Sequence, residues 1–201
     1  MATGLPLPAA EPARLAAIDW AMLEIAVGIG DMPVAAYELI RYRDDVGSPR
    51  IPLEVVDLGL RGAPNFELLQ LTRPSLTLSP PYYAQYEHRL RRLAPVLSLP
   101  FFLPEELPLT KAMQALTTLV EHVDHPSAGR AALELADKAL DAAAARLSPH
   151  SARPVALVDI GDARHLRAFG FDSLFGSTLD RLRRSLGSGQ DDASGAVAPV
   201  L

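Results

Sequence analysis

Short apolar runs alternate with longer segments of helical period along most of the chain. Leu15 to Asp19, Leu53 to Leu58 and Val96 to Pro100 are apolar runs of strand length. Trp20 to Ile29 and Pro108 to Val123 instead repeat apolar residues at intervals of three and four. Strands separated by helices in this order form parallel sheets with crossover helices. The sequence therefore predicts an α/β fold.

The alternation divides the chain into four segments. Residues 1–123 hold a full series of strands and helices, which predicts an N-terminal, Rossmann-like α/β lobe. Residues 124–150 repeat Leu and Ala at helical spacing and predict one long helix. Residues 151–186 predict the beginning of a second α/β lobe, in which Val155 to Ile160 is expected to be a central strand between helices. Residues 187–201 have the small, polar composition of a disordered tail.

Composition narrows the classes of partner. The 201 residues carry a net charge of only -5, and Lys and Arg form no stripe, so nucleic acid is not expected as a partner. The chain has no cysteine, which excludes disulfides and thiolate metal sites. Its start lacks the pattern of a signal peptide and no apolar stretch is long enough to span a bilayer, so the chain as written is expected in the cytoplasm.

Motifs of covalent chemistry are missing from the sequence. It contains no nucleophile elbow, no glycine-rich phosphate loop and no triad of metal ligands, so neither an enzyme nor an intrinsic cofactor is expected. Asp162 with His165, and His122 with His125, each offer only two ligands at close spacing. A protein zinc site takes at least three, so no metal site is expected.

Four segments of the chain resemble a known family. In order they read LAAIDWAMLEIAVGIGDMPVAA, VVDLGLRGAPNFELLQLTRPSLTLS, LAPVLSLP and DARHLRAFGFDSLFGSTLDRL. From about Arg14 to about Leu182, their order and spacing are similar to those of ferric-hydroxamate-binding proteins of the FhuD type. The resemblance implies a class III periplasmic binding protein with a helical backbone, a complete N-terminal lobe, a long linking helix and a partial C-terminal lobe. It also implies a periplasmic receptor that captures a ferric siderophore of the hydroxamate type and delivers it to the inner-membrane permease of an ABC importer.

The same resemblance assigns roles to individual residues. Arg61, in GLRGAPN, falls where the family has an arginine that binds the hydroxamate oxygens, and a guanidinium offers five permanently charged donors. Tyr82, or its neighbour Tyr83, falls where a tyrosine contacts the same oxygens. Glu67, in PNFELL, falls where a glutamate docks onto arginines of the permease. A carboxylate in the first turn of a helix is also favoured by the helix dipole, so both explanations of Glu67 remain open.

The chain also departs from the family pattern. Asp45 and Leu78 stand where the family tends to place tryptophans, which implies a thinner aromatic wall and a different siderophore. The remainder of the second lobe is missing from the sequence, so weak ligand binding and self-association through residues 155–170 are expected, whereas a full-length version is expected to be a monomer. A receptor for another iron chelate, for haem or for a corrinoid, and a non-functional fragment, remain alternatives.

Overall fold

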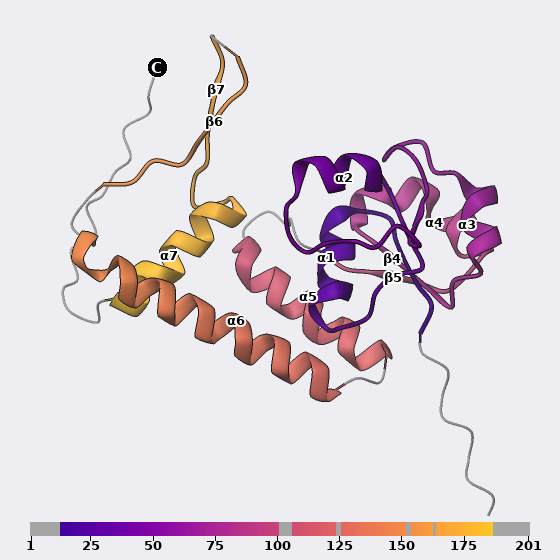
Figure 1. Ribbon diagram of the computed structural model, residues 1–201, viewed down its shortest axis with the longest axis horizontal. Coiled ribbons are helices and arrows are strands. Elements are labelled where there is room, and N and C mark those ends of the chain that lie inside the picture. Colours follow the sequence, from indigo (N-terminus) through magenta and orange to yellow (C-terminus); the bar gives the residue numbers. More distant parts are fainter. Residues whose placement is uncertain (1–12, 101–105, 124–125, 152–153, 163, 187–201) are drawn as a thin grey trace, which may run out of the picture. The chain divides into compact units, whose positions relative to one another are not determined.

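The computed structural model describes residues 13–100, 106–123, 126–151, 154–162 and 164–186. The chain divides into two compact units, which are described separately. The first comprises residues 1–104 and 110–133, and the second comprises residues 105–109 and 134–201. In the first unit, as Figure 1 shows, the elements are β1 (Leu15–Ala17), α1 (Trp20–Gly28), β2 (Ala35–Ala36), α2 (Leu39–Asp45), β3 (Val56–Asp57), α3 (Phe66–Thr72), β4 (Leu76–Ser79), the 3-10 helix η1 (Pro81–Tyr83), α4 (Ala84–Leu90), β5 (Val96–Ser98) and most of α5 (Pro108–Val123).

A five-stranded sheet forms the centre of the first unit. Its strand order is β3-β2-β1-β4-β5, and every neighbouring pair is parallel. Ala16 of β1 lies in register with Ala35 on one side and with Thr77 on the other. The order of the strands reverses between β1 and β4, which makes this the switch point of an open α/β sheet. The predicted α/β fold is confirmed.

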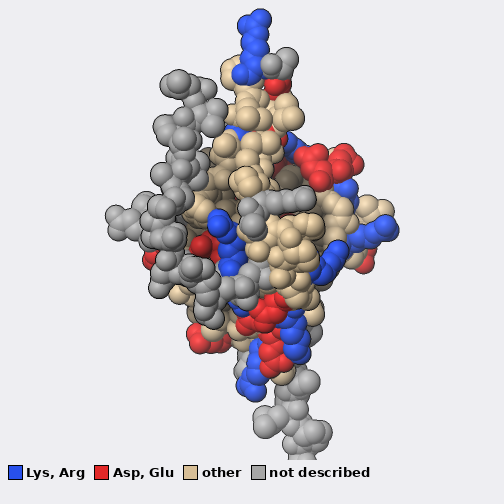
Figure 2. Space-filling model, turned by 90° about the vertical axis from the view of Figure 1, so that its left-hand side faces the viewer, with Lys and Arg blue, Asp and Glu red and all other residues tan. Residues whose placement is uncertain are grey.

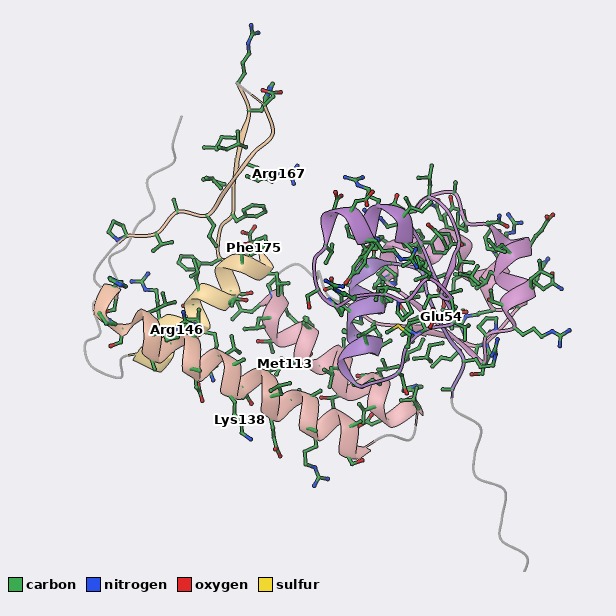
Figure 3. All side chains as sticks on the ribbon, in the orientation of Figure 1. Glu54, Met113, Lys138, Arg146, Arg167 and Phe175 are labelled. Carbon is green, nitrogen blue, oxygen red and sulfur yellow. The ribbon has the colours of Figure 1, made fainter. Side chains whose placement is uncertain are left out.

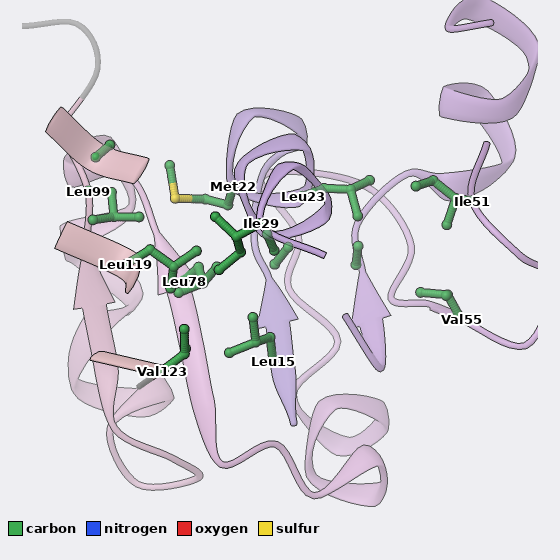
Figure 4. Close-up of a cluster of buried hydrophobic side chains, with 14 of the residues drawn as sticks. Leu15, Met22, Leu23, Ile29, Ile51, Val55, Leu78, Leu99, Leu119 and Val123 are labelled. Carbon is green, nitrogen blue, oxygen red and sulfur yellow. The ribbon is translucent and has the colours of Figure 1, made fainter. Parts of the chain in front are cut away.

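The three inner strands, β2, β1 and β4, are largely buried on both faces, as parallel strands covered by helices must be, while the edge strands β3 and β5 are partly exposed. Leu15 and Leu78 join one apolar cluster with residues of α1, α2 and α5, which Figure 4 shows from close by. Ala16 and Ile18 join a second cluster with residues of α3 and α4. Successive residues of a strand point to opposite faces, so β1 contributes to both clusters in turn.

Helix α5 has the bounds that the sequence predicts and begins with proline, which suits a first helical position. Ala115, Leu119 and Val123 recur along it at intervals of four, and all three are buried in the first cluster. The next helix, α6 (Pro126–Leu147), packs closely on α5: a side chain built at Gly129 would collide with Val120. Glycine at this position is therefore required by the approach of the two helices.

The second unit contains the C-terminal part of α6, the 3-10 helix η2 (Ser148–His150), β6 (Val158–Ile160), β7 (Leu166–Ala168) and α7 (Leu174–Leu186). Helix α7 begins after Ser173, whose hydroxyl accepts a hydrogen bond from the backbone of Gly176 at 2.9 Å and so caps the helix. Arg181 of α7 donates to Asp141 of α6 at 3.1 Å. The contact between Arg181 and Asp141 joins the two helices within the unit.

Strands β6 and β7 form an antiparallel hairpin, and every residue in both is exposed. The expectation of a central strand between helices is therefore wrong for the residues that the structure describes. Within the five-residue connection, the backbone of Gly161 donates to the carbonyl of His165 at 3.0 Å, and a loop this short can join only antiparallel neighbours. At the top of Figure 2 the hairpin carries few charged side chains below its tip. Figure 3 labels Arg167 of β7 and Phe175 of α7.

Candidate functional site

Four loops bring charged and aromatic residues to one edge of the five-stranded sheet. Asp19 follows β1, Glu38 follows β2, Arg61 follows β3 and Tyr82 follows β4. Because the strands are parallel, all four positions lie at the carboxyl edge of the sheet. Asp19 and Tyr82 flank the switch point between β1 and β4, which is where open α/β sheets bind their ligands.

Asp19 is held by a helix N-terminus and by Arg61, and it also accepts a hydrogen bond from the hydroxyl of Tyr82. Its Oδ1 accepts a hydrogen bond from the backbone of Ala21 at 2.9 Å and so caps the N-terminus of α1. Its Oδ2 lies 3.5 Å from Nη1 of Arg61. The Asp19 side chain is only 8% exposed, so this carboxylate is fixed beneath the surface by the helix and by the arginine.

Glu38 accepts hydrogen bonds from both the backbone and the side chain of Arg61. Its Oε2 accepts from Nε of Arg61 at 2.6 Å, and its Oε1 accepts from the Arg61 backbone at 3.3 Å. The Glu38 backbone has a φ of 52°, a left-handed conformation that costs a residue with a side chain about 1–2 kcal/mol. A hydrogen bond from its N–H to the carbonyl of Gly59, at 2.8 Å, helps to hold that conformation. The loops after β2 and β3 are thereby joined.

The guanidinium of Arg61 lies between these two carboxylates and over an aromatic ring. Its Cζ is 4.6 Å from the centroid of the Trp20 ring, within the range of a cation–π contact. Partial burial acts to lower the pKa of Arg61, but the hydrogen bond from Glu38 and the charges of Glu38 and Asp19 outweigh it and raise the pKa. The side chain remains 34% exposed. A charged donor is thus presented at the surface in a fixed orientation.

The two tyrosines after β4 differ in exposure. Tyr82 is 59% exposed, whereas Tyr83 is 7% exposed and belongs to the second apolar cluster. Desolvation of the Tyr82 hydroxyl, together with the charge of Asp19 and a hydrogen bond to it, raises the Tyr82 pKa. Burial and the Asp19 charge likewise raise the pKa of Tyr83. Both phenols therefore stay protonated, and Tyr82 has the ring that a ligand can reach.

The remaining residues named from the sequence lie elsewhere. Glu67 is exposed in the first turn of α3. Leu78 is fully buried in β4 and cannot line a surface site, so the comparison with a ligand-facing tryptophan is wrong at this position. Asp45 ends α2, and its Oδ2 accepts from Nε of Arg41 at 2.9 Å. The aromatic ring beside Arg61 comes instead from Trp20.

Asp19, Glu38 and Trp20 were not identified from the sequence as site residues. Each lies two or three positions beyond the last residue of β1 or β2, whereas the predicted run Leu15 to Asp19 already contained Asp19. Nearness to a strand end was the available signal. Residues after successive parallel strands gather at one edge, whatever their separation along the chain.

The described residues meet the requirements of neither a metal site nor a membrane-spanning helix. Residues that the structure describes contain no group of three or more His, Cys, Asp or Glu that could hold a metal ion. Among the same residues, no helix is both long and apolar enough to cross a membrane.

A hollow of about 510 Å³ lies at the opposite, amino-terminal edge of the sheet, lined among others by Arg14, Met32 and Glu54. It is remote from the carboxyl edge, where the candidate site residues gather.

Comparisons with known proteins agree with this architecture. The iron(3+)-hydroxamate-binding protein FhuD of Escherichia coli (strain K12) is 32% identical over 172 residues, which cover 86% of this chain and 58% of the relative. The chain thus spans well under two thirds of that relative's length.

Solved structures share the fold. The Fe3+-Desferal-bound siderophore-binding protein FhuD from Vibrio cholerae has a TM-score of 0.77 and 24% identity, over 86% of this chain and 66% of its own. The periplasmic catecholate-siderophore-binding protein VctP, also from Vibrio cholerae, has a TM-score of 0.62 and 20% identity, over 86% of this chain and 61% of its own.

One family model covers nearly all of the described structure. It matches residues 15–185, which include the sheet, helices α1 to α6, the hairpin and most of α7. The model is described as a periplasmic binding protein. The chain therefore belongs to the periplasmic binding protein family.

Proposed function

We propose that this chain belongs to the receptor of an ABC importer and that its carboxyl-edge site binds a ferric siderophore of the hydroxamate type. The protein would act by binding and delivery, without covalent chemistry. The relatives named above bind ferric hydroxamate, ferric Desferal or catecholate siderophores, and the family name indicates a periplasmic location.

The observation that carries the proposal is the placement of Arg61. It lies at the carboxyl edge with Nε fixed by Glu38 at 2.6 Å, and a third of its side chain is open to a ligand. The oxygens of a ferric hydroxamate carry partial negative charge and accept charge-assisted hydrogen bonds from such a donor. Tyr82 adds a protonated hydroxyl and an exposed ring beside it. Tyr83, buried beneath, supports Tyr82 through ring contact at 5.2 Å between centroids.

The domain division and the permease contact belong to the same proposal. Residues 1–123 would form the first lobe, residues 124–150 the linking helix and residues 151–186 the beginning of the second lobe, while residues 187–201 lie outside the described structure. In support, one boundary between the two compact units falls within α6, between residues 133 and 134, although residues 105–109 group with the second unit. Glu67 would dock onto the permease, since it is exposed on α3 and makes no part of the Arg61 cluster.

Calorimetric titration tests the proposal directly. The chain is titrated with ferrioxamine B, a ferric catecholate, haem and a corrinoid, and with metal-free desferrioxamine as the control for iron dependence. Arg61→Ala should weaken ferrioxamine binding by about 1.5–3 kcal/mol for each hydrogen bond lost. Arg41→Ala, which removes an exposed arginine paired with Asp45 on α2, serves as the matched control. Absence of binding, or an unchanged affinity in Arg61→Ala, would refute the proposal.

A further inference from the structure

We propose that the carboxylates of Asp19, Glu38 and Asp57 set a charge preference in this site, so that it selects cationic or neutral ferric chelates over anionic ones. The inference rests on the proposed function and identifies which chelates that function serves. In this proposal Asp19, Glu38 and Asp57 determine specificity, Asp19 and Glu38 also position Arg61, and none of the three contacts the ligand.

The balance of charge in the cluster is negative. Asp19 and Glu38 both pair with Arg61. Asp57, the last residue of β3, is bound to the segment that carries Glu38. Its Oδ2 accepts a hydrogen bond from the backbone of Ile40, two residues beyond Glu38, at 2.9 Å. Three carboxylates against one guanidinium leave two negative charges. The arginine therefore supplies directed hydrogen-bond donors without making the site cationic.

The two carboxylates that touch Arg61 cannot easily turn away to be replaced by a ligand. Their side chains are only 8% and 10% exposed, and each has a second anchor in the backbone, at Ala21 for Asp19 and at Arg61 itself for Glu38. Charges held below the surface are screened less by salt than charges that extend into solvent. An incoming anion would therefore meet a repulsive field that salt screens only in part.

The positive ends of nearby helices are already occupied. Asp19 caps α1, and Asp57 accepts from the first turn of α2. Each carboxylate thus offsets the partial positive charge that a free helix N-terminus would present to an anion. What remains at the surface is the exposed third of Arg61 and the ring of Tyr82.

Ferric chelates differ in overall charge around similar oxygens. Three singly deprotonated hydroxamates neutralise ferric iron, and the free amine of ferrioxamine B makes that chelate a cation. Three doubly deprotonated catecholates leave the chelate a trianion. Hydrogen-bond donors surrounded by carboxylates favour the neutral and cationic hydroxamate chelates and disfavour the trianionic catecholate chelate. Unlike charges attract at these distances and like charges repel.

A series of chelates with one iron centre isolates the effect of charge. Ferrioxamine B is cationic, its N-acetylated derivative is neutral and its N-succinylated derivative is anionic. At low salt the cation should bind on the order of tenfold more tightly than the anion, and the ratio should shrink between about 10 mM and about 1 M salt as the Debye length falls from about 30 Å to about 3 Å.

Two variants connect that ratio to the named carboxylates. Glu38→Gln removes a charge but keeps an acceptor for the Arg61 backbone. Asp57→Asn removes a charge but keeps an acceptor for the backbone of Ile40. Each variant should reduce the ratio of cation to anion affinity severalfold. The control is Glu54→Gln, which removes an exposed charge at the opposite edge of the sheet (Figure 3). Equal affinity for all three chelates, or a ratio unchanged in both variants, would overturn the inference while leaving siderophore binding intact. Failure to bind any of the three would overturn both this inference and the proposed function.

Discussion

Asp19 combines a helix cap and an ion pair, and two substitutions separate them. Asparagine caps helices as well as aspartate does, so Asp19→Asn should keep the hydrogen bond to Ala21 and lose the charge that faces Arg61. The pair is 3.5 Å long and its arginine is 34% exposed, so solvent screens it and its loss should cost about 0.5–1 kcal/mol of the free energy of unfolding. Asp19→Ala removes the cap as well, which adds about 1 kcal/mol.

Urea denaturation followed by circular dichroism measures both variants. We expect the free energy of unfolding to fall by less than about 1 kcal/mol in Asp19→Asn and by about 2 kcal/mol in Asp19→Ala, because the two losses are separate. Equal destabilisation in the two variants would show that the cap contributes nothing. Wild-type stability in Asp19→Ala would contradict both contacts.

Three further outcomes follow from the contacts. Gly129→Ala should lower the free energy of unfolding by about 1–3 kcal/mol through its clash with Val120, whereas Gly47→Ala, with open space around it, should not; equal denaturation midpoints would contradict the close packing of α5 and α6. Glu67→Gln should reduce iron uptake by cells that depend on this receptor while its ferrioxamine affinity stays unchanged; normal uptake would exclude a docking role. Light scattering should detect concentration-dependent self-association that Ile160→Lys diminishes, since this hairpin residue is 74% exposed on an unpaired strand edge; a monomer at all concentrations would contradict it.

Much of the first unit could be predicted from the sequence because its strands and long helices have strong periodicity. Helix α2 was missed, since it has only seven residues and no side-chain cap: it begins after Glu38, which adopts a left-handed conformation instead. Strand β6 was expected in a buried sheet because most residues from Val155 to Ile160 are apolar, although Asp159 in β6 and Arg167 in β7 are charged. Hydropathy predicts a strand but not its neighbours, and the short connection should have favoured an antiparallel pair.

The site was only partly predictable. Arg61 and Tyr82 were identified through a family resemblance, while the residues that hold them were not. Glu38 is 23 residues from Arg61 along the chain, and their contact depends on the sheet order that places β2 beside β3. Leu78 shows the reverse error: the resemblance placed it at the ligand, but Leu78 and its neighbours Thr77 and Ser79 are all buried in the sheet.

Trp20 provides the most direct test of the account, because it is the only tryptophan in the chain and its ring lies under Arg61. Ferric hydroxamates absorb light and quench nearby indole fluorescence, so titration with ferrioxamine B should quench the emission of Trp20 to saturation. Metal-free desferrioxamine should not. The dissociation constant from the same titration should rise roughly tenfold or more in Arg61→Ala, the equivalent of at least one charge-assisted hydrogen bond. Emission that ferrioxamine leaves unchanged, or an equal dissociation constant in Arg61→Ala, would contradict a ferric-siderophore site at the carboxyl edge of the sheet.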